Sequence, residues 1–201
     1  MPLLDFHTHR PTAEGVTTPR CFGIHPWSCG ETEPSQFSTL YTQFEDAEIV
    51  GECGLDKCCE TPWDVQMDYF VRQIEIAEQL NKPMVIHCVR AFNELMELRK
   101  KYHRTPWVVH GFTGSTELYN QLLHADIEVS FGDAILDKRR SKVRETTSKA
   151  DPHRIFLETD DSGADISDIY KEAADLMGCD PATLQDAIKS HYEALLKTKK
   201  Y

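Results

Sequence analysis

The 201-residue sequence contains no apolar run long enough to cross a bilayer, and its N-terminus has no basic region followed by an apolar segment. We therefore expect a cytoplasmic protein without a membrane anchor. The seven cysteines include no Cys-x-x-Cys pair and are odd in number. This favours reduced, buried thiols over a disulfide framework or a thiolate metal site. A GxGxxG or Walker-type loop is also missing, which argues against a nucleotide-binding fold.

Positive charge is scarce, because 22 Lys and Arg face 33 Asp and Glu and give a net charge of -11. An acidic surface repels the nucleic-acid backbone, so we expect no stable duplex-DNA-binding surface. Catalysis on a phosphodiester is still allowed. Carboxylates that ligate cations count as negative in this sum although the bound cations neutralise them.

The chain has no low-complexity linker and fits one domain over residues 1–201. Short apolar runs that read as buried parallel strands alternate with amphipathic stretches that read as helices. The expected strands are 3–7, 20–24, 48–52, 83–87, 107–110, 127–131 and 154–158. The expected helices are 34–45, 63–81, 91–102, 116–125, 138–149, 166–177 and 181–197.

Repeated strand–helix units predict an α/β protein, either a (β/α) barrel or an open doubly wound sheet. Polar residues suited to bind a metal follow several different strands. A closed barrel brings all its strand ends around one mouth, whereas an open sheet spreads them along a crevice. We therefore predict a TIM-type (β/α) barrel.

The first apolar run leads into His7 and His9. Side chains two apart in a strand share a face, so the two imidazoles are expected to converge on a divalent cation. Taken alone, a His-x-His pattern is weak evidence.

Further candidate ligands follow later strands. Glu52 lies between two glycines and could bridge two cations, or sit exposed in a turn. His87 and His110 each end an apolar run and could be ligands or core histidines. Asp160 could ligate a metal and take a proton from water, or cap a turn. Imidazoles with carboxylates suit Zn, Mn or Mg.

Six motifs in this order resemble the TatD family of metal-dependent hydrolases. They are Asp-Phe-His-Thr-His at 5–9, Gly-Ile-His-Pro at 23–26, Gly-Glu-Cys-Gly-Leu-Asp at 51–56, Ile-His-Cys-Val-Arg-Ala at 86–91, His-Gly-Phe-Thr-Gly at 110–114 and Glu-Thr-Asp at 158–160. The resemblance implies a TIM-type barrel, two divalent metal ions and hydrolysis of phosphodiesters by a metal-activated water. Deoxyribonuclease is the usual family label.

The resemblance also implies a role for each ligand. His7 and His9 would hold one metal, and His87 and His110 the second. Glu52 would bridge both metals, and Asp160 would orient or deprotonate the attacking water. The catalytic residues would thus be Asp160 and Glu52.

Three departures from the family pattern affect the fold and the substrate site. The segment between His9 and Gly23 has room only for a short loop, so we predict seven strands and one missing β/α unit. Trp27 stands after His25-Pro26, where the family often has another histidine. The long loop that the family has after its Glu-Thr-Asp motif is missing here.

We assign substrate binding to four residues: Arg90, Lys57, His25 and Trp27. Arg90 and Lys57 could contact phosphate or form surface ion pairs. Trp27 could stack on a base or sugar, or simply pack. The expected substrate is a phosphodiester, such as DNA ends or a small phosphodiester. The alternatives are hydrolysis of an amide, lactone or phosphomonoester, and a non-catalytic metal-stabilised binding protein.

Overall fold

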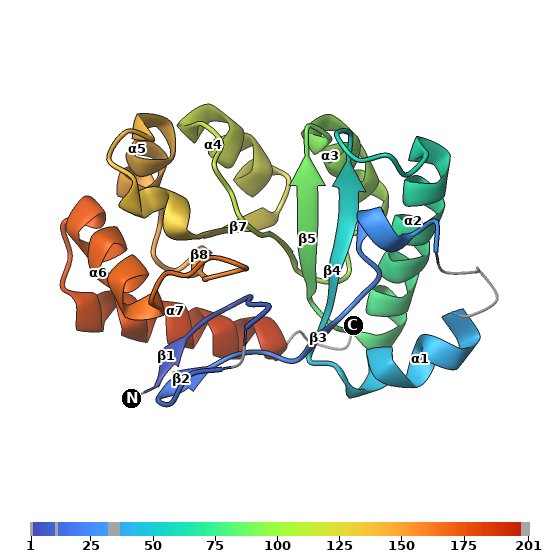
Figure 1. Ribbon diagram of the computed structural model, residues 1–201, viewed down its shortest axis with the longest axis horizontal. Coiled ribbons are helices and arrows are strands. Elements are labelled where there is room, and N and C mark those ends of the chain that lie inside the picture. Colours follow the sequence, from blue (N-terminus) through green and yellow to red (C-terminus); the bar gives the residue numbers. More distant parts are fainter. Residues whose placement is uncertain (1, 11, 32–36, 198–201) are drawn as a thin grey trace. The chain divides into compact units, whose positions relative to one another are not determined.

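The computed structural model describes residues 2–10, 12–31 and 37–197, which form two compact units (Figure 1). Unit 1 contains Met1–Pro19, His110–His124 and Glu128–Leu195, and unit 2 contains Arg20–Val109, Ala125–Ile127 and Leu196–Tyr201. The candidate ligands are divided between them. Unit 1 holds His7, His9, His110 and Asp160, and unit 2 holds His25, Glu52 and His87. A single domain over residues 1–201 stays a prediction.

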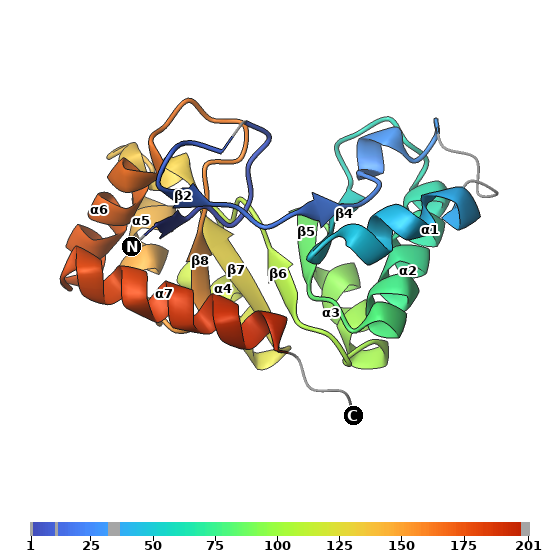
Figure 2. The same ribbon diagram turned by 90° about the horizontal axis from the view of Figure 1, so that it is seen from below.

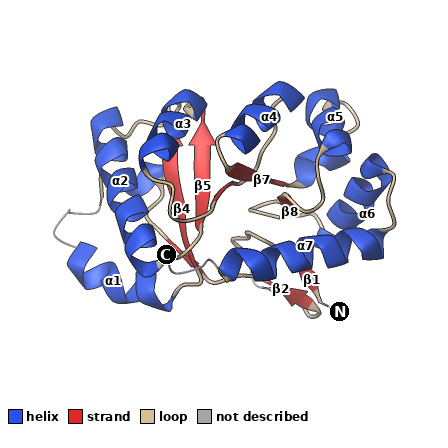
Figure 3. Cartoon of the chain, turned by 180° about the vertical axis from the view of Figure 1, so that it is seen from behind, coloured by secondary structure: helices blue, strands red, loops and turns tan. Residues whose placement is uncertain are grey.

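Unit 2 is built on four parallel strands in the order β3 (Cys21–Phe22), β4 (Ile49–Asp56), β5 (Met84–Val89) and β6 (Trp107–Val109). A short 3-10 helix (Pro26–Ser28) follows β3. The α-helices are α1 (Phe37–Asp46), α2 (Trp63–Leu80) and α3 (Phe92–Lys101). Helix α2 packs against β4 and α3 against β5, as Figure 3 shows from behind.

The strands of unit 2 form its core because their apolar runs are covered on both faces. Ile49 and Val50 in β4, and Met84, Val85 and Ile86 in β5, are fully buried. A parallel strand between helices needs such a continuous run, whereas a half-exposed strand would alternate polar and apolar residues. The polar residues appear where the strands end. The candidate ligands of unit 2 therefore lie at one edge of its sheet.

Unit 1 contains two parallel strand pairs, β1 (Leu3–Leu4) with β2 (Val16–Thr17) and β7 (Ile127–Phe131, apart from its first residue) with β8 (Ile155–Leu157). Its α-helices are α4 (Thr116–His124), α5 (Ser141–Lys149), α6 (Ile166–Met177) and α7 (Pro181–Leu196). Figure 2 shows α7 from its side. Helix α6 packs against β8 and α5. The predicted α/β class with parallel strands is confirmed.

Each of the seven predicted strands has a counterpart, but the described residues contain an eighth, β2. It pairs with β1 through Leu3 opposite Val16 and Leu4 opposite Thr17. The short loop expected before Gly23 therefore includes a strand, and the count of seven is not confirmed. Strand β1 also ends at Leu4, so His7 and His9 lie beyond it.

The predicted helices differ from the observed ones mainly at their ends. Helix α5 begins at Ser141 rather than at residue 138, because Arg139 folds back on Asp137 through its backbone N–H (3.0 Å) and its Nε (2.9 Å). The first three residues of the helix predicted over 34–45 lie outside the described residues. No helix in the described part of the chain is both long and apolar enough to span a membrane.

Candidate metal centre

The first cluster lies in unit 1, where the segment after β1 runs beside the segment after β8. Asp160 N–H donates to the His7 carbonyl (2.9 Å), and His9 N–H donates to the Asp160 carbonyl (3.1 Å). These two hydrogen bonds bring three side chains together. Nε2 lies 3.9 Å from Asp160 Oδ1 for the buried His7, and 3.5 Å for the exposed His9. The convergence predicted from the His-x-His spacing is therefore present, although a loop delivers it.

A network of polar side chains holds the segment that carries this cluster. The Asp5 carboxylate accepts hydrogen bonds from the Thr159 backbone N–H (2.9 Å) and hydroxyl (2.6 Å). Thr8 Oγ1 donates to the Asp160 carbonyl at 3.1 Å and lies 2.9 Å from the Thr159 hydroxyl. Burial raises the pKa of Asp5, although the bonds from Thr159 oppose this. The network ties residues 5–9 to 159–160 and so holds the ligand side chains in place.

His110, the residue directly after β6, lies beside the cluster of unit 1. Its ring centroid lies 4.9 Å from that of His7, and its Nδ1 lies 3.4 Å from Glu158 Oε1. Glu158 is fully buried and accepts hydrogen bonds from Gly111 N–H and Ser130 Oγ. Burial raises the pKa of Glu158, but the interactions with His110, His7 and Ser130 outweigh it and the pKa is lowered. A carboxylate beside Nδ1 favours the tautomer with the proton on Nδ1, in which Nε2 of His110 can ligate a cation.

The second cluster lies in unit 2 and contains His25, Glu52 and His87. Glu52 Oε1 lies 2.9 Å from His87 Nδ1 and 3.1 Å from His25 Nε2. The rings of the two histidines are 4.4 Å apart. His25, a predicted substrate contact, thus lies in the same cluster as Glu52 and His87.

Asp56, at the end of β4, supports this second cluster. Its Oδ2 lies 3.2 Å from His87 Nε2 and accepts a hydrogen bond from Trp27 Nε1 (2.8 Å), while Oδ1 accepts one from Cys58 N–H (2.7 Å). Burial raises the pKa of Asp56, but these hydrogen bonds outweigh it and the pKa is lowered. When His87 carries its proton on Nε2, it donates to Asp56 and presents the Nδ1 lone pair beside Glu52. This is the arrangement expected of a metal-ligating histidine.

Two buried glutamines of α2 hold the loops that carry these residues. Gln73 Oε1 accepts from Ile24 N–H (2.6 Å) and its Nε2 donates to the Ile24 carbonyl (3.1 Å), which fixes the residue before His25. Gln66 Oε1 accepts from Asp56 N–H at 2.8 Å. Amide side chains suit this task because each can donate and accept at the same time.

The glycines around Glu52 lie where two strands approach each other closely. A Cβ on Gly51 would lie 2.2 Å from the Val85 carbonyl oxygen, and one on Gly54 would lie 2.0 Å from that of His87. Both residues have positive φ. The glycines therefore allow β4 to lie close to β5, which sets Glu52 beside His87.

Lys57 and Arg90 have different surroundings. Lys57 Nζ forms an ion pair with Glu94 (2.5 Å) and lies 5.3 Å from the centroid of the Trp63 ring. Arg90 is exposed just after β5 and has a φ of 55°. Lys57 thus shows the ion pair that was the alternative to phosphate contact. It also lines a pocket of about 360 Å³ with Asp56, Cys59, Thr61, Trp63, Gln66 and Glu94.

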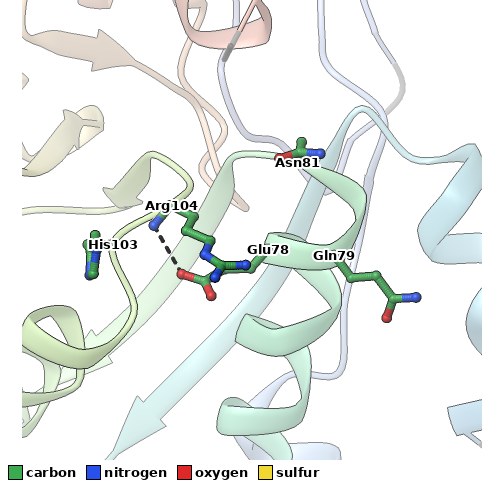
Figure 4. A pocket seen from close by; sticks show the side chains of 5 residues that line it. All are labelled: Glu78, Gln79, Asn81, His103 and Arg104. Carbon is green, nitrogen blue, oxygen red and sulfur yellow. Dashed lines mark hydrogen bonds between the residues drawn. The ribbon is translucent and has the colours of Figure 1, made fainter. Parts of the chain in front are cut away.

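A larger surface pocket of about 730 Å³ lies at the other end of α2 (Figure 4). It is lined by Glu78, Gln79, Asn81, His103 and Arg104. Within it Glu78 accepts a hydrogen bond from the Arg104 backbone N–H at 3.0 Å. Gln66, which holds Asp56, lies in the first turn of α2, so the pocket is remote from the cluster of unit 2 and provides matched control residues.

The donor set of each cluster fits a divalent cation. In His7, His9 and Asp160, and again in His25, Glu52 and His87, the candidate ligand atoms lie within 4.8 Å of one another. Imidazole and carboxylate ligands suit Zn, Mn or Mg. None of the seven cysteines, all of which the structure describes, forms a disulfide bond. Burial raises the pKa of Cys29 and Cys88 to about 12, so these thiols stay protonated and are poor ligands.

Two functional candidates, Glu158 and Asp56, had no assigned role in the sequence analysis. Both stand in the quoted motifs, at the start of Glu-Thr-Asp and at the end of Gly-Glu-Cys-Gly-Leu-Asp. Each is a buried carboxylate that faces a candidate ligand histidine. In the sequence, each of them is recognisable as a carboxylate at the end of an apolar strand. The histidine that each carboxylate faces cannot be predicted from this pattern.

Parallel strands followed by clusters of histidine and carboxylate define an α/β protein of the metal-binding class. The chain belongs to a particular family of that class: the model of the TatD related DNase family matches residues 12–197. The resemblance of the six motifs is thereby confirmed.

Known proteins similar to this chain include two curated nucleases. The 3'-5' RNA nuclease TATDN2 of Homo sapiens is 33% identical over 69% of this chain and 19% of its own length. The 3'-5' ssDNA/RNA exonuclease TatD of Erwinia billingiae is 32% identical over 69% of this chain and 55% of its own. The chain thus spans about half the length of the bacterial relative and a fifth of the human one.

A solved structure supports the fold. The TatD homologue YJJV of Escherichia coli K12 superimposes with a TM-score of 0.78 over 92% of this chain and 78% of that one, at 21% sequence identity. At this identity the likeness shows a shared α/β fold and no more.

Proposed function

We propose that this chain is a divalent-metal-dependent hydrolase that cleaves phosphodiester bonds. The observation that carries the proposal is the presence of two histidine–carboxylate clusters, one in each unit. Within each cluster, the candidate donor atoms lie within 4.8 Å of one another. Family membership and the names of the two nuclease relatives support the choice of bond. They also make single-stranded nucleic acid the preferred substrate class.

We assign one cation to His7, His9 and Asp160, with His110 beside His7. We assign the second to Glu52 and His87, beside which His25 lies. The resemblance gives His110 to the second cation and makes Glu52 a bridge between both, and these roles stay predictions. So do the closed TIM-type barrel and the count of seven strands.

Bound divalent cations would supply an acidified water and would neutralise charge on the phosphoryl oxygens. The chain's own groups do the remaining work. Asp160 is partly exposed beside His9 and can accept a proton from the water. Glu158 lies beside Nδ1 of His110 and Asp56 beside Nε2 of His87, and each carboxylate would favour a proton on the nitrogen that it faces, so that the other ring nitrogen could ligate a cation. Arg90, Lys57, His25 and Trp27 remain the candidate contacts to substrate.

The test is hydrolysis of bis(p-nitrophenyl) phosphate by metal-stripped protein reconstituted with Mg, Mn or Zn. Glu52→Ala and Asp160→Asn should each lower kcat by a factor of roughly 100 or more. His103→Ala, which removes an exposed histidine of the remote pocket, is the control and should keep full activity.

Two results would overturn the proposal. Cleavage of p-nitrophenyl phosphate but not of the diester would make the chain a monoesterase. Stoichiometric cation binding without turnover of either ester would favour the non-catalytic binding protein.

A further inference from the structure

Trp27 is an aromatic side chain displayed to solvent. It is 62% exposed, and Leu196 is the other exposed large hydrophobic residue in the described part of the chain. An exposed indole loses hydrophobic free energy that packing would recover. A single exposed apolar residue is ordinary, so the argument depends on how this one is held and what it faces.

Trp27 is held through both its side chain and its backbone. Its Nε1 donates to Asp56 Oδ2 at 2.8 Å, and the backbone N–H of Trp27 donates to His25 Nδ1 at 3.2 Å. The Thr61 hydroxyl donates to the Trp27 carbonyl at 3.5 Å. A ring that is already ordered loses little conformational entropy when a ligand stacks on it.

The fixed ring lies next to the cluster of unit 2. Its centroid is 4.8 Å from that of His25 and 5.9 Å from that of His87, with interplanar angles of 86° and 74°. The ring therefore meets both imidazoles edge to face and does not stack on them. The same Asp56 oxygen that holds the indole also lies 3.2 Å from His87 Nε2. A single carboxylate thus sets the ring and a candidate ligand together.

We propose that Trp27 is a stacking platform for a nucleobase of the substrate, adjacent to the cation held by Glu52 and His87. This inference rests on the proposed function and names its substrate as a nucleoside-containing phosphodiester of a single strand. In a nucleotide, one sugar separates the base from the phosphate. The Trp27 ring lies next to the cluster, so a base stacked on it would bring its phosphate close to the cation. Every base has a π-face, so the platform would be indifferent to sequence.

The charge of the chain supports this choice. With a net charge of -11, general attraction of the phosphate backbone is weak. The lysine nearest to Asp56 along the chain, Lys57, is already paired with Glu94. Affinity for a strand must then come from local contacts, and base stacking is one that needs no positive surface.

Binding is tested on metal-stripped protein in chelator, so that no strand is cut. Wild type is titrated with a short oligothymidylate and with an abasic oligonucleotide of the same length. We expect the oligothymidylate to bind roughly tenfold more tightly. Trp27→Ala should abolish this difference. Trp27→Phe, which keeps a ring but cannot donate to Asp56, should retain most of it. Leu196→Ala, which removes the other exposed large hydrophobic residue, is the control and should bind like wild type.

Catalysis provides the second arm. Thymidine 5'-(p-nitrophenyl phosphate) and methyl p-nitrophenyl phosphate share a leaving group and differ in the nucleoside. The wild-type ratio of kcat/KM should favour the thymidine ester by roughly tenfold, and Trp27→Ala should bring this ratio close to one.

The possible failures are distinguishable. Equal affinity for the two oligonucleotides, or a difference that survives in Trp27→Ala, overturns the platform. Equal kcat/KM for the two esters also overturns it while the proposed hydrolysis stands. If neither ester is hydrolysed with any cation, the proposed function fails and the binding arm alone decides the role of Trp27.

Discussion

The backbone N–H of Gly111 donates a hydrogen bond to Glu158 Oε1 at 2.6 Å. This contact fixes a buried carboxylate against Nδ1 of His110, the residue that precedes Gly111. The strand end that supplies a candidate ligand thus also supplies the donor that positions its supporting carboxylate.

Replacing Glu158 by Gln should weaken divalent-cation binding by roughly 10- to 100-fold, because the amide still accepts from Gly111 but carries no charge facing His110. Isothermal titration of the metal-stripped protein with a divalent cation measures this affinity. Glu158→Ala should in addition destabilise the fold, since Gly111 N–H and Ser130 Oγ lose an acceptor at about 1–3 kcal/mol each. Exposed Glu145→Gln is the control. Unchanged cation affinity in Glu158→Gln would refute the supporting role.

Gln73→Leu should destabilise the protein by roughly 2–4 kcal/mol, because both backbone groups of buried Ile24 lose their side-chain partner. Urea unfolding followed by circular dichroism measures the loss. Gln79→Leu makes the same chemical change at an exposed position of the same helix and should cost less than about 0.5 kcal/mol. Equal effects of the two changes would show that the Gln73–Ile24 hydrogen bonds carry no special weight.

The sequence predicted those elements whose boundaries are set by local chemistry. Helix α6 begins after Asp165, whose carboxylate caps Ser167 N–H, and ends at Gly178 in the left-handed conformation. Its observed bounds match the predicted 166–177. Strand β2 was missed because two residues, Val16 and Thr17, are too few to show any periodicity.

For the site, the sequence predicted which side chains follow strands, and the structure brings His7, His9 and Asp160 together. It could not predict the supporting groups. Glu158 acts on His110, 48 positions earlier, and Asp56 acts on His87, 31 positions later. Such partners are set by the register of neighbouring strands, which no single-sequence pattern determines.

Gly54→Ala should destabilise unit 2 by at least about 3 kcal/mol, because its Cβ would lie 2.0 Å from the His87 carbonyl oxygen at a φ of +148°. Gly30→Ala is the matched control, since nothing lies within 4 Å of its Cβ. Thermal melting of the two variants is the measurement. A Gly54→Ala protein that melts with wild type would show that β4 can move away from β5 at little cost.

Asp165→Ala should cost about 0.5–2 kcal/mol at neutral pH through loss of the α6 cap. The hydrogen bonds from Ser167 lower the pKa of Asp165 below its ordinary value of 3.8. The cap therefore stabilises the fold fully above that value and is lost as the pH falls through the lower, folded pKa. The stability gap between wild type and variant should shrink between about pH 5 and pH 2. Asp168→Ala, also exposed in the first turn, should show a smaller gap, and a gap independent of pH would contradict the capping role.

Divalent cations should raise the melting temperature of metal-stripped protein, because a ligand that binds only the folded chain stabilises it by mass action. At a hundredfold excess over Kd the gain is about 2.7 kcal/mol, or roughly 5–10 °C for a chain of this size. His7→Ala and His87→Ala each remove a ligand from one cluster and should each lose part of the shift, whereas His103→Ala should keep all of it. Sodium chloride at matched ionic strength separates site binding from screening of the acidic surface. A shift that sodium reproduces would mean that the clusters hold no specific cation.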